Sequence, residues 1–125
     1  MTDELGPRLG EVIGPCYTAD AMCRETGMSP AGLDAAVREL RVLRLVSSDS
    51  VDLYPAFQVR DHTPLPHLDA VLSLLREGID SPWAWVLWLA GQAPGNPLSR
   101  IEQLAAGEAE DVIADAGRTV WSWAS

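Results

Sequence analysis

The hydrophobic and polar positions between residues 17 and 40, YTADAMCRETGMSPAGLDAAVREL, predict two short helices joined by a turn. Thr18 is a residue type that caps helices, and the first helix is expected to end at Gly27. Ser29 is expected to cap the second helix, with Pro30 in its first position, where the missing N–H costs nothing. The second helix has an apolar face with i, i+3, i+4, i+7 spacing, formed by Leu33, Ala36, Val37 and Leu40.

The spacing around the turn is that of a helix-turn-helix. Cys23 lies four residues before Gly27, and Leu33 lies six residues after it. Glycine adopts the left-handed backbone of the turn, and a small residue at position 23 lets the helices cross closely. An ordinary pair of antiparallel helices remains the alternative, because the exposed face of the second helix offers one good base or phosphate partner, Arg38.

Two short strands are predicted directly after the second helix. Residues 45–47 and 51–59 flank a polar turn and are rich in strand-forming residues. A hairpin in this place is the wing of a winged helix-turn-helix. Pro55 is expected at a sheet edge or a strand end, because it cannot donate a hydrogen bond. Tyr54 and Phe57 are expected to pack beneath the helices.

The second half of the chain predicts a helical lobe. Residues 61–67, DHTPLPH, contain two prolines and predict a linker, so that residues 1–60 form the first lobe and residues 65–125 the second. Ser81 is expected to cap a helix, and Gly107 to end one. The expected fold is mainly α, with a helix-turn-helix lobe, a small β-hairpin and four C-terminal helices at residues 65–79, 82–90, 99–107 and 108–123. The first of these has one apolar face, made of Leu65, Leu68, Val71, Leu72, Leu75 and Ile79.

The stretch WAWVLWLAG, residues 83–91, contains three tryptophans and no charge. As a helix its apolar part spans about 14 Å, against about 30 Å of bilayer hydrocarbon, which excludes a membrane span. A helix that is apolar all round must be covered on more than one face. We expect Trp83, Trp85 and Trp88 to contact a partner or a second copy in a homodimer. Burial of all three in the protein's own core is an equally weighted alternative.

The charge of the chain disfavours strong non-specific DNA binding. The net charge is −9, and all nine basic residues are arginines. Residues 1–60 carry six arginines and nine acidic residues, whereas residues 61–125 carry three arginines and nine acidic residues. Because phosphate neutralisation needs positive charge, only a local basic face could bind DNA. Its candidate residues are Ser29, Arg38, Arg41, Arg44 and Arg60.

The sequence shows no catalytic or cofactor-binding motif. It has no phosphate-binding loop, no GxSxG and no HExxH. His62 and His67 are expected to be solvated loop residues, and Cys16 and Cys23 small buried thiols. The N-terminus has no apolar signal segment, which favours a cytoplasmic location. We therefore expect a binding protein, and not an enzyme, with no cofactor and no metal.

The order WxxWLAG followed by APGNPLSRIEQLAAGEAEDVIADA resembles the C-terminal toxin-binding domain of Xre/MbcA/ParS-type antitoxins. The resemblance covers about residues 65–123. The first lobe is similar to that of actinobacterial winged-helix proteins, whereas many antitoxins of the family have a Cro-like N-terminal bundle. The matching positions are Trp85, Trp88, Leu89, Pro97, Leu104, Gly107, Val112 and Ile113.

The resemblance implies an antitoxin that neutralises a NAD-consuming, RES-domain toxin, with binding of its own promoter DNA as a further role. In this family the C-terminal portion reaches the toxin, which implies that Arg118, Trp121, Trp123 and Ser125 form the toxin-facing end. Packing of Trp121 and Trp123 within the second lobe is the alternative. A stand-alone winged-helix transcriptional regulator, whose C-terminal lobe dimerises, is the second hypothesis. An interaction module without a DNA role is the third.

Overall fold

The computed structural model describes residues 14–124. The protein is mainly helical with small antiparallel sheets, as the sequence predicts. In chain order the elements are β1 (Cys16–Tyr17), α2 (Ala19–Thr26), α3 (Pro30–Arg38), β2 (Leu45–Val46), β3 (Asp52–Pro55), the 3-10 helix η1 (Ala56–Gln58), β4 (Val59–Arg60), β5 (Thr63–Pro64), α4 (Leu68–Gly78), α5 (Pro82–Ala90), α6 (Arg100–Ala105) and α7 (Ala109–Ala124).

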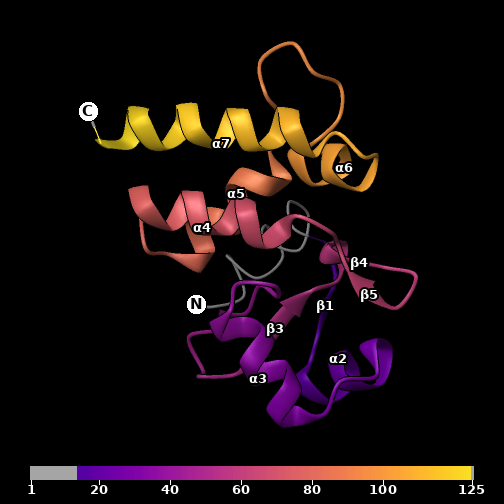
Figure 1. The fold of residues 1–125 in the computed structure, drawn as a ribbon. Helices are drawn as coiled ribbons and strands as arrows, with labels where there is room; N and C mark the ends of the chain where they lie inside the picture. The colour runs from indigo at the N-terminus through magenta and orange to yellow at the C-terminus, as the bar shows by residue number, and fades with distance from the viewer. Residues whose placement is uncertain (1–13, 125) are drawn as a thin grey trace.

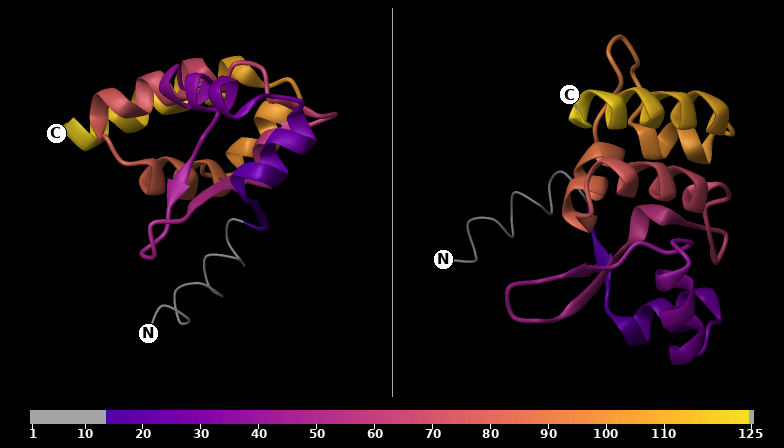
Figure 2. Two further views of the ribbon diagram at one scale, coloured as in Figure 1. Left: turned by 90° about the horizontal axis from the view of Figure 1, so that it is seen from below. Right: turned by 60° about the vertical axis from the view of Figure 1, so that its left-hand side comes forward.

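Helices α2 and α3 occupy one end of the molecule, and α4 and α7 lie side by side at the other (Figure 1). The loop that joins α5 to α6, residues 91–99, projects beyond α7 (Figure 2). The C-terminal ends of α4 and α7 lie together, because a Cβ on Gly78 would meet Trp123 and Val120. The last turn of α7 therefore stands at a corner of the molecule, far from α2.

The predicted helix caps are present. The Thr18 hydroxyl accepts a hydrogen bond at 3.2 Å from the backbone N–H of Ala21, at the start of α2. Gly27 ends this helix in the left-handed conformation, with φ of 76°. Ser29 and Ser81 cap α3 and α5 in the same way as Thr18 caps α2. Each cap satisfies an N–H group that would otherwise have no partner within its helix.

The end of α3 differs from the prediction. The helix stops at Arg38, so Leu40 does not extend its apolar face. Leu40 has φ of 62°, and its neighbour Arg41 donates through its backbone N–H to the Ala36 carbonyl at 2.9 Å. This is a Schellman end with leucine where glycine is usual. The strained backbone is offset because the Leu40 side chain is buried in the core.

The three-stranded sheet has the order β1-β3-β2, and both pairings are antiparallel. Pro55 ends β3 opposite Cys16, as expected for a residue without an N–H donor. Part of the predicted linker is a folded segment, because β5 pairs with β4 in register Val59↔Pro64. Leu65, directly after β5, is buried.

A smaller core lies between α2, α3 and the sheet, and Tyr54 is buried in it, as predicted. Phe57 packs instead against a larger core. Ile79, predicted on the apolar face of the first C-terminal helix, is exposed, because α4 ends at Gly78. The larger core joins both halves of the chain; its buried members are Leu40, Leu43, Leu45, Leu65, Leu68, Val71, Leu72, Leu75, Trp85, Val86, Trp88, Leu89, Ile101, Leu104, Val112 and Ala116.

A buried glutamine fixes the segment after α3. Gln58 has no exposed surface. Its Nε2 donates to the Leu43 carbonyl at 2.9 Å, and its Oε1 accepts from the Leu43 N–H at 2.7 Å. The side chain thus replaces the backbone partner that an adjacent strand would supply.

Candidate functional site

Arg38, Arg41 and Arg44 lie at or just after the C-terminal end of α3, whereas the other two proposed DNA-contacting residues, Ser29 and Arg60, lie at the start of α3 and in β4. Ser29 is occupied as a helix cap, with its hydroxyl 3.0 Å from the Gly32 N–H. Arg38 is exposed in the last turn of α3. Arg41 Nε lies 2.8 Å from Glu39 Oε1 in an exposed ion pair. Of these side chains, Arg38 has the guanidinium that is most available to a phosphate.

Arg44 and Arg60 are directed back to the protein. Arg44 Nη1 lies 3.3 Å from Asp34 Oδ1, so an acid on the exposed face of α3 neutralises it. Burial raises the pKa of Tyr54, and the hydrogen bond from Arg44 opposes this shift in part. Arg60 donates to the carbonyls of Phe57 and Val59. The five candidates therefore do not form a uniformly positive face.

Two of the tryptophans predicted to contact a partner are covered by the chain itself. Trp85 and Trp88 are buried in the larger core, so α5 does not present them to another protein. Trp85 Nε1 donates to the Ile79 carbonyl at 2.8 Å. Trp83 is half-buried, and its Nε1 donates to the Val46 carbonyl at 3.3 Å. Packing within the chain covers Trp85 and Trp88, which agrees with the alternative that these tryptophans belong to the protein's own core.

A buried ion pair, absent from the sequence prediction, joins α6 to α7. Arg100 Nε lies 2.6 Å from Asp115 Oδ2, and both side chains are largely buried. Arg100 Nη1 donates to the Trp88 carbonyl at 2.9 Å. One local signal existed: Arg100 is the first residue of α6, where the helix dipole disfavours a cation unless an acid compensates it.

A hydroxyl extends this network. Trp88 Nε1 donates to Thr119 Oγ1 at 3.0 Å, and Thr119 Oγ1 donates to the Asp115 carbonyl at 2.9 Å. The ring, the guanidinium and the carboxylate therefore hold the end of α5 and the start of α6 against the middle of α7. These contacts hold α7 in place and so determine where its C-terminal end lies.

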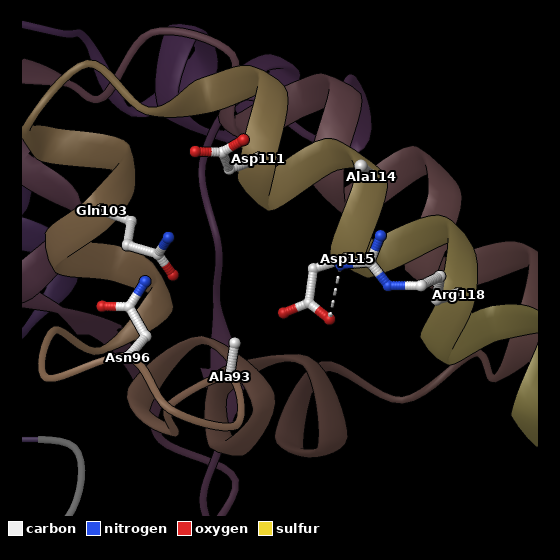
Figure 3. A pocket seen from close by; sticks show the side chains of 7 residues that line it. All are labelled: Ala93, Asn96, Gln103, Asp111, Ala114, Asp115 and Arg118. Carbon is white, nitrogen blue, oxygen red and sulfur yellow. Dashed lines mark ion pairs between the residues drawn. The ribbon is translucent and has the colours of Figure 1, made fainter.

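A polar pocket of about 210 Å³ opens beside Asp115 (Figure 3). The Asp115 side chain projects into it from α7, and Gln103 faces it from α6 (Figure 3). Arg118 Nη2 lies 3.7 Å from Asp115 Oδ1 at the rim. The residues that line the pocket are Ala93, Asn96, Gln103, Asp111, Ala114, Asp115 and Arg118.

The end of α7 presents the two C-terminal tryptophans differently. Trp121 exposes 75% of its surface and Trp123 exposes 40%. Trp123 packs over Gly78 at the end of α4, where its Cε3 would lie 2.9 Å from an added Cβ. The side chain of Arg118, one turn earlier, is exposed. Ser125 lies outside the described residues.

The histidines and cysteines do not gather into a site within residues 14–124. His62 is exposed, and its Nδ1 lies 3.2 Å from Glu25 Oε1. His67 precedes α4 and makes no side-chain cap to it. The prediction of buried thiols is wrong for Cys16, whose side chain is exposed, and Cys23 is half-buried. In this part of the chain, groups of three or more His, Cys, Asp or Glu that could hold a metal are absent.

Comparison with known protein families, with curated proteins and with solved structures found no match. Among the helices of residues 14–124, none is both long enough and apolar enough to span a bilayer.

Proposed function

We propose that the protein is an antitoxin-like binding protein that neutralises a RES-type toxin in the cytoplasm through the C-terminal end of α7. One observation carries the proposal: Trp121 is 75% exposed at the end of a helix, while Trp85 and Trp88 are buried. Exposed tryptophans are uncommon on monomers and are enriched among the residues that dominate protein interfaces. The resemblance of residues 65–123 to toxin-binding domains supports the same end of the chain.

The surroundings of Trp121 suit an anchor. Trp123 packs against Gly78, and Trp88 holds Thr119, so the helix before and after position 121 is supported on its inner side. Holding an aromatic side chain on a rigid helix lowers the entropic cost of binding. Arg118 lies one turn before Trp121 and supplies a polar contact for the rim of the interface.

The test is substitution of Trp121 by alanine, with Val51→Ala in the β2–β3 turn as a control that also truncates an exposed apolar side chain. We expect Trp121→Ala to weaken binding of the co-expressed RES-type toxin by about 30-fold or more, and to abolish rescue of growth. The circular dichroism spectrum should not change, because the side chain is exposed. Full rescue by Trp121→Ala would refute the proposal.

Removal of every residue after Thr119 is a less clean variant. It also deletes Trp123, which packs on Gly78. Loss of rescue with retained helix content would agree with the proposal. If the shortened protein unfolds, the C-terminal tryptophans belong to the core, and the anchor role is rejected.

A second candidate function, DNA binding by a stand-alone transcriptional regulator or by an autoregulatory antitoxin, is favoured by one observation. The chain order β1–α2–α3–β2–β3 with sheet order β1-β3-β2 agrees with the proposed winged helix, in which α3 would be the recognition helix and the β2–β3 hairpin the wing. Against it stand the acids Asp34 and Glu39, which pair with Arg44 and Arg41.

Two substitutions of opposite sign test the DNA role by fluorescence anisotropy with the upstream promoter. Arg38→Ala should weaken binding and lower the salt dependence by about one released counterion. Asp34→Ala should strengthen binding, because it leaves Arg44 unpaired on the same face. If the wild-type protein does not bind its upstream region, the DNA role is rejected.

We also propose that the protein forms a homodimer through the outer face of α5. Fewer residues are available for this contact than the sequence predicts, because Trp85 and Trp88 are buried. Leu87, 46% exposed, and the half-buried Trp83 lie one turn apart on the same face of α5 and remain to form such a contact.

A further inference from the structure

Two buried side chains direct oxygen atoms toward the polar pocket beside α7. Gln103 is 4% exposed and Asp115 is 8% exposed. Gln103 Nε2 donates to Glu108 Oε1 at 3.2 Å, whereas Gln103 Oε1 accepts no hydrogen bond from the described residues. Asp115 Oδ2 accepts from Arg100, whereas among the described residues Asp115 Oδ1 has only Arg118 nearby, at 3.7 Å, which is beyond hydrogen-bond distance.

These oxygens are not sealed in the interior. Among the described residues, every fully covered side-chain nitrogen or oxygen has a hydrogen-bond partner. Gln103 Oε1 and Asp115 Oδ1 are therefore reached from the pocket that both residues line. A buried carboxylate and a buried amide with open acceptors favour a ligand that carries several N–H donors and a positive charge.

We propose that this pocket binds the guanidinium group of an arginine side chain from a partner protein. A guanidinium has five N–H donors in one plane, so it can donate to more than one acceptor, and Asp115 Oδ1 and Gln103 Oε1 are the acceptors that this pocket offers. Asp111 at the rim adds a second negative charge. Asn96 Oδ1 is engaged with the Leu98 N–H at 2.9 Å, which leaves its amide N–H donors on the pocket wall.

The size of the pocket favours a guanidinium on a protein side chain over one on a small molecule. Sites that enclose small molecules have volumes of roughly 300–1,000 Å³. The pocket here measures about 210 Å³ and is open to solvent. A pocket of this size encloses the end of one guanidinium-bearing chain and leaves the rest of the molecule outside, which suits an arginine side chain held by a protein.

Arg118 acts as an internal competitor for this pocket. Its side chain is 71% exposed, and its Nη2 lies closest to the same Asp115 oxygen that the incoming group would use. Binding displaces Arg118 and leaves the Arg100–Asp115 pair in place, because that pair uses the other carboxylate oxygen. The proposal does not rest on the toxin-binding function, since neither Trp121 nor a toxin takes part in it.

The experiment uses the full chain and four capped or free probes. N-acetyl-arginine methylamide carries the guanidinium, and N-acetyl-citrulline methylamide has the same shape without the charge. N-acetyl-lysine methylamide carries a charge without the planar fork, and agmatine carries the guanidinium without the flanking peptide groups of a protein chain. Binding is followed by NMR through the side-chain amide signals of Asn96 and Gln103.

We expect the arginine probe to shift both amide signals and to bind about tenfold more tightly than the citrulline probe. The lysine probe and agmatine should bind more weakly than the arginine probe. Equal binding of the arginine and citrulline probes, or absence of a shift at Gln103, would overturn the proposal. Tighter binding of agmatine than of the arginine probe would overturn its assignment to a protein side chain.

Substitutions at exposed positions avoid loss of the fold. Arg118→Gln should tighten binding of the arginine probe about threefold or more, because it removes the competing cation. Arg76→Gln, which removes the same charge from an exposed position on α4, is the matched control and should change binding less. Asp111→Asn should weaken binding. The proposal is rejected if Arg118→Gln has no more effect than Arg76→Gln, or if it weakens binding.

Discussion

The guanidinium carbon of Arg100 lies 4.4 Å from the centroid of the Trp88 ring, while the same guanidinium group binds the carbonyl of Trp88 through a hydrogen bond of 2.9 Å. Arg100 thus contacts Trp88 twice, once over the face of the indole ring and once at the backbone carbonyl. The second partner of the guanidinium is Asp115, so a single side chain links α5, α6 and α7. Such a contact is favourable because it is shielded from water.

Substitution of Arg100 by alanine should lower the free energy of unfolding by about 3–5 kcal/mol, because it leaves the buried Asp115 carboxylate without a partner. Arg100→Lys should also destabilise, since an ammonium group cannot replace the planar contact with Trp88. Urea denaturation followed by tryptophan fluorescence measures both. Arg41→Ala, which breaks an exposed pair, serves as the control and should cost no more than about 1 kcal/mol. Equal effects of Arg100→Ala and Arg41→Ala would contradict this role.

Two glycine substitutions should have opposite effects. Alanine at Gly78 would place its Cβ 2.9 Å from Trp123 Cε3 and 3.3 Å from the backbone of Val120, and should destabilise by about 1–3 kcal/mol. Alanine at Gly117, also helical, meets no atom within 4 Å and should stabilise by about 0.5–1 kcal/mol. Thermal unfolding measures both. If Gly78→Ala is neutral, Trp123 is not held against α4.

The helix caps were predictable because each depends on residues only a few positions apart. Thr18, Ser29 and Ser81 lie three residues before the N–H groups that they accept from, so the sequence alone contains the whole interaction. Gly27 and Gly107 have positive φ at the ends of helices, as expected from their residue type. Local chemistry of this kind fixed most helix boundaries to within a few residues.

Glu102 predicts a pH dependence of stability. Its carboxylate accepts a hydrogen bond of 2.7 Å from the Ser99 N–H in the capping box of α6, and this bond, with help from the Ser99 hydroxyl, lowers the pKa of Glu102 below its usual 4.5. A lowered folded pKa means that the stabilisation is complete above pH 4.5 and is lost as the pH falls through the folded value. Glu102→Gln can keep the bond but does not titrate.

The expected result is that stability falls more steeply below pH 4.5 in the wild-type protein than in Glu102→Gln. Denaturation in urea at a series of pH values gives both curves. Parallel curves through the acidic range would show that the cap does not contribute through its charge.

If the protein is a dimer, a charged residue in its interface should halve the molecular mass measured in solution. Leu87→Asp should convert the protein to a monomer in light scattering without lowering its melting temperature by more than a few degrees, because Leu87 is 46% exposed. Val51→Asp is the matched control, since Val51 is 47% exposed but lies in the β2–β3 turn. A monomeric wild-type protein would reject the dimer outright.

The contacts that escaped prediction join residues far apart in the chain. Gln58 binds the backbone of Leu43 across fifteen residues, and Arg100 meets Asp115 across the same separation. A glutamine or an arginine in a sequence is most often a surface residue, so composition gave no reason to bury either. The tryptophans of α5 illustrate the same limit, because whether a neighbouring helix or another protein covers them depends on tertiary packing.

The larger core extends across the predicted boundary between the two lobes. Leu40, Leu43 and Leu45 precede the supposed linker, yet they share one core with residues of α4 and α5. Cutting the chain at residue 61 would expose these leucines on one fragment and their partners on the other. The two halves should therefore unfold in one cooperative transition, and neither should refold alone. The segment directly after α3, residues 40–45, is therefore joined to α4 and α5 through one interior, with no hinge between them.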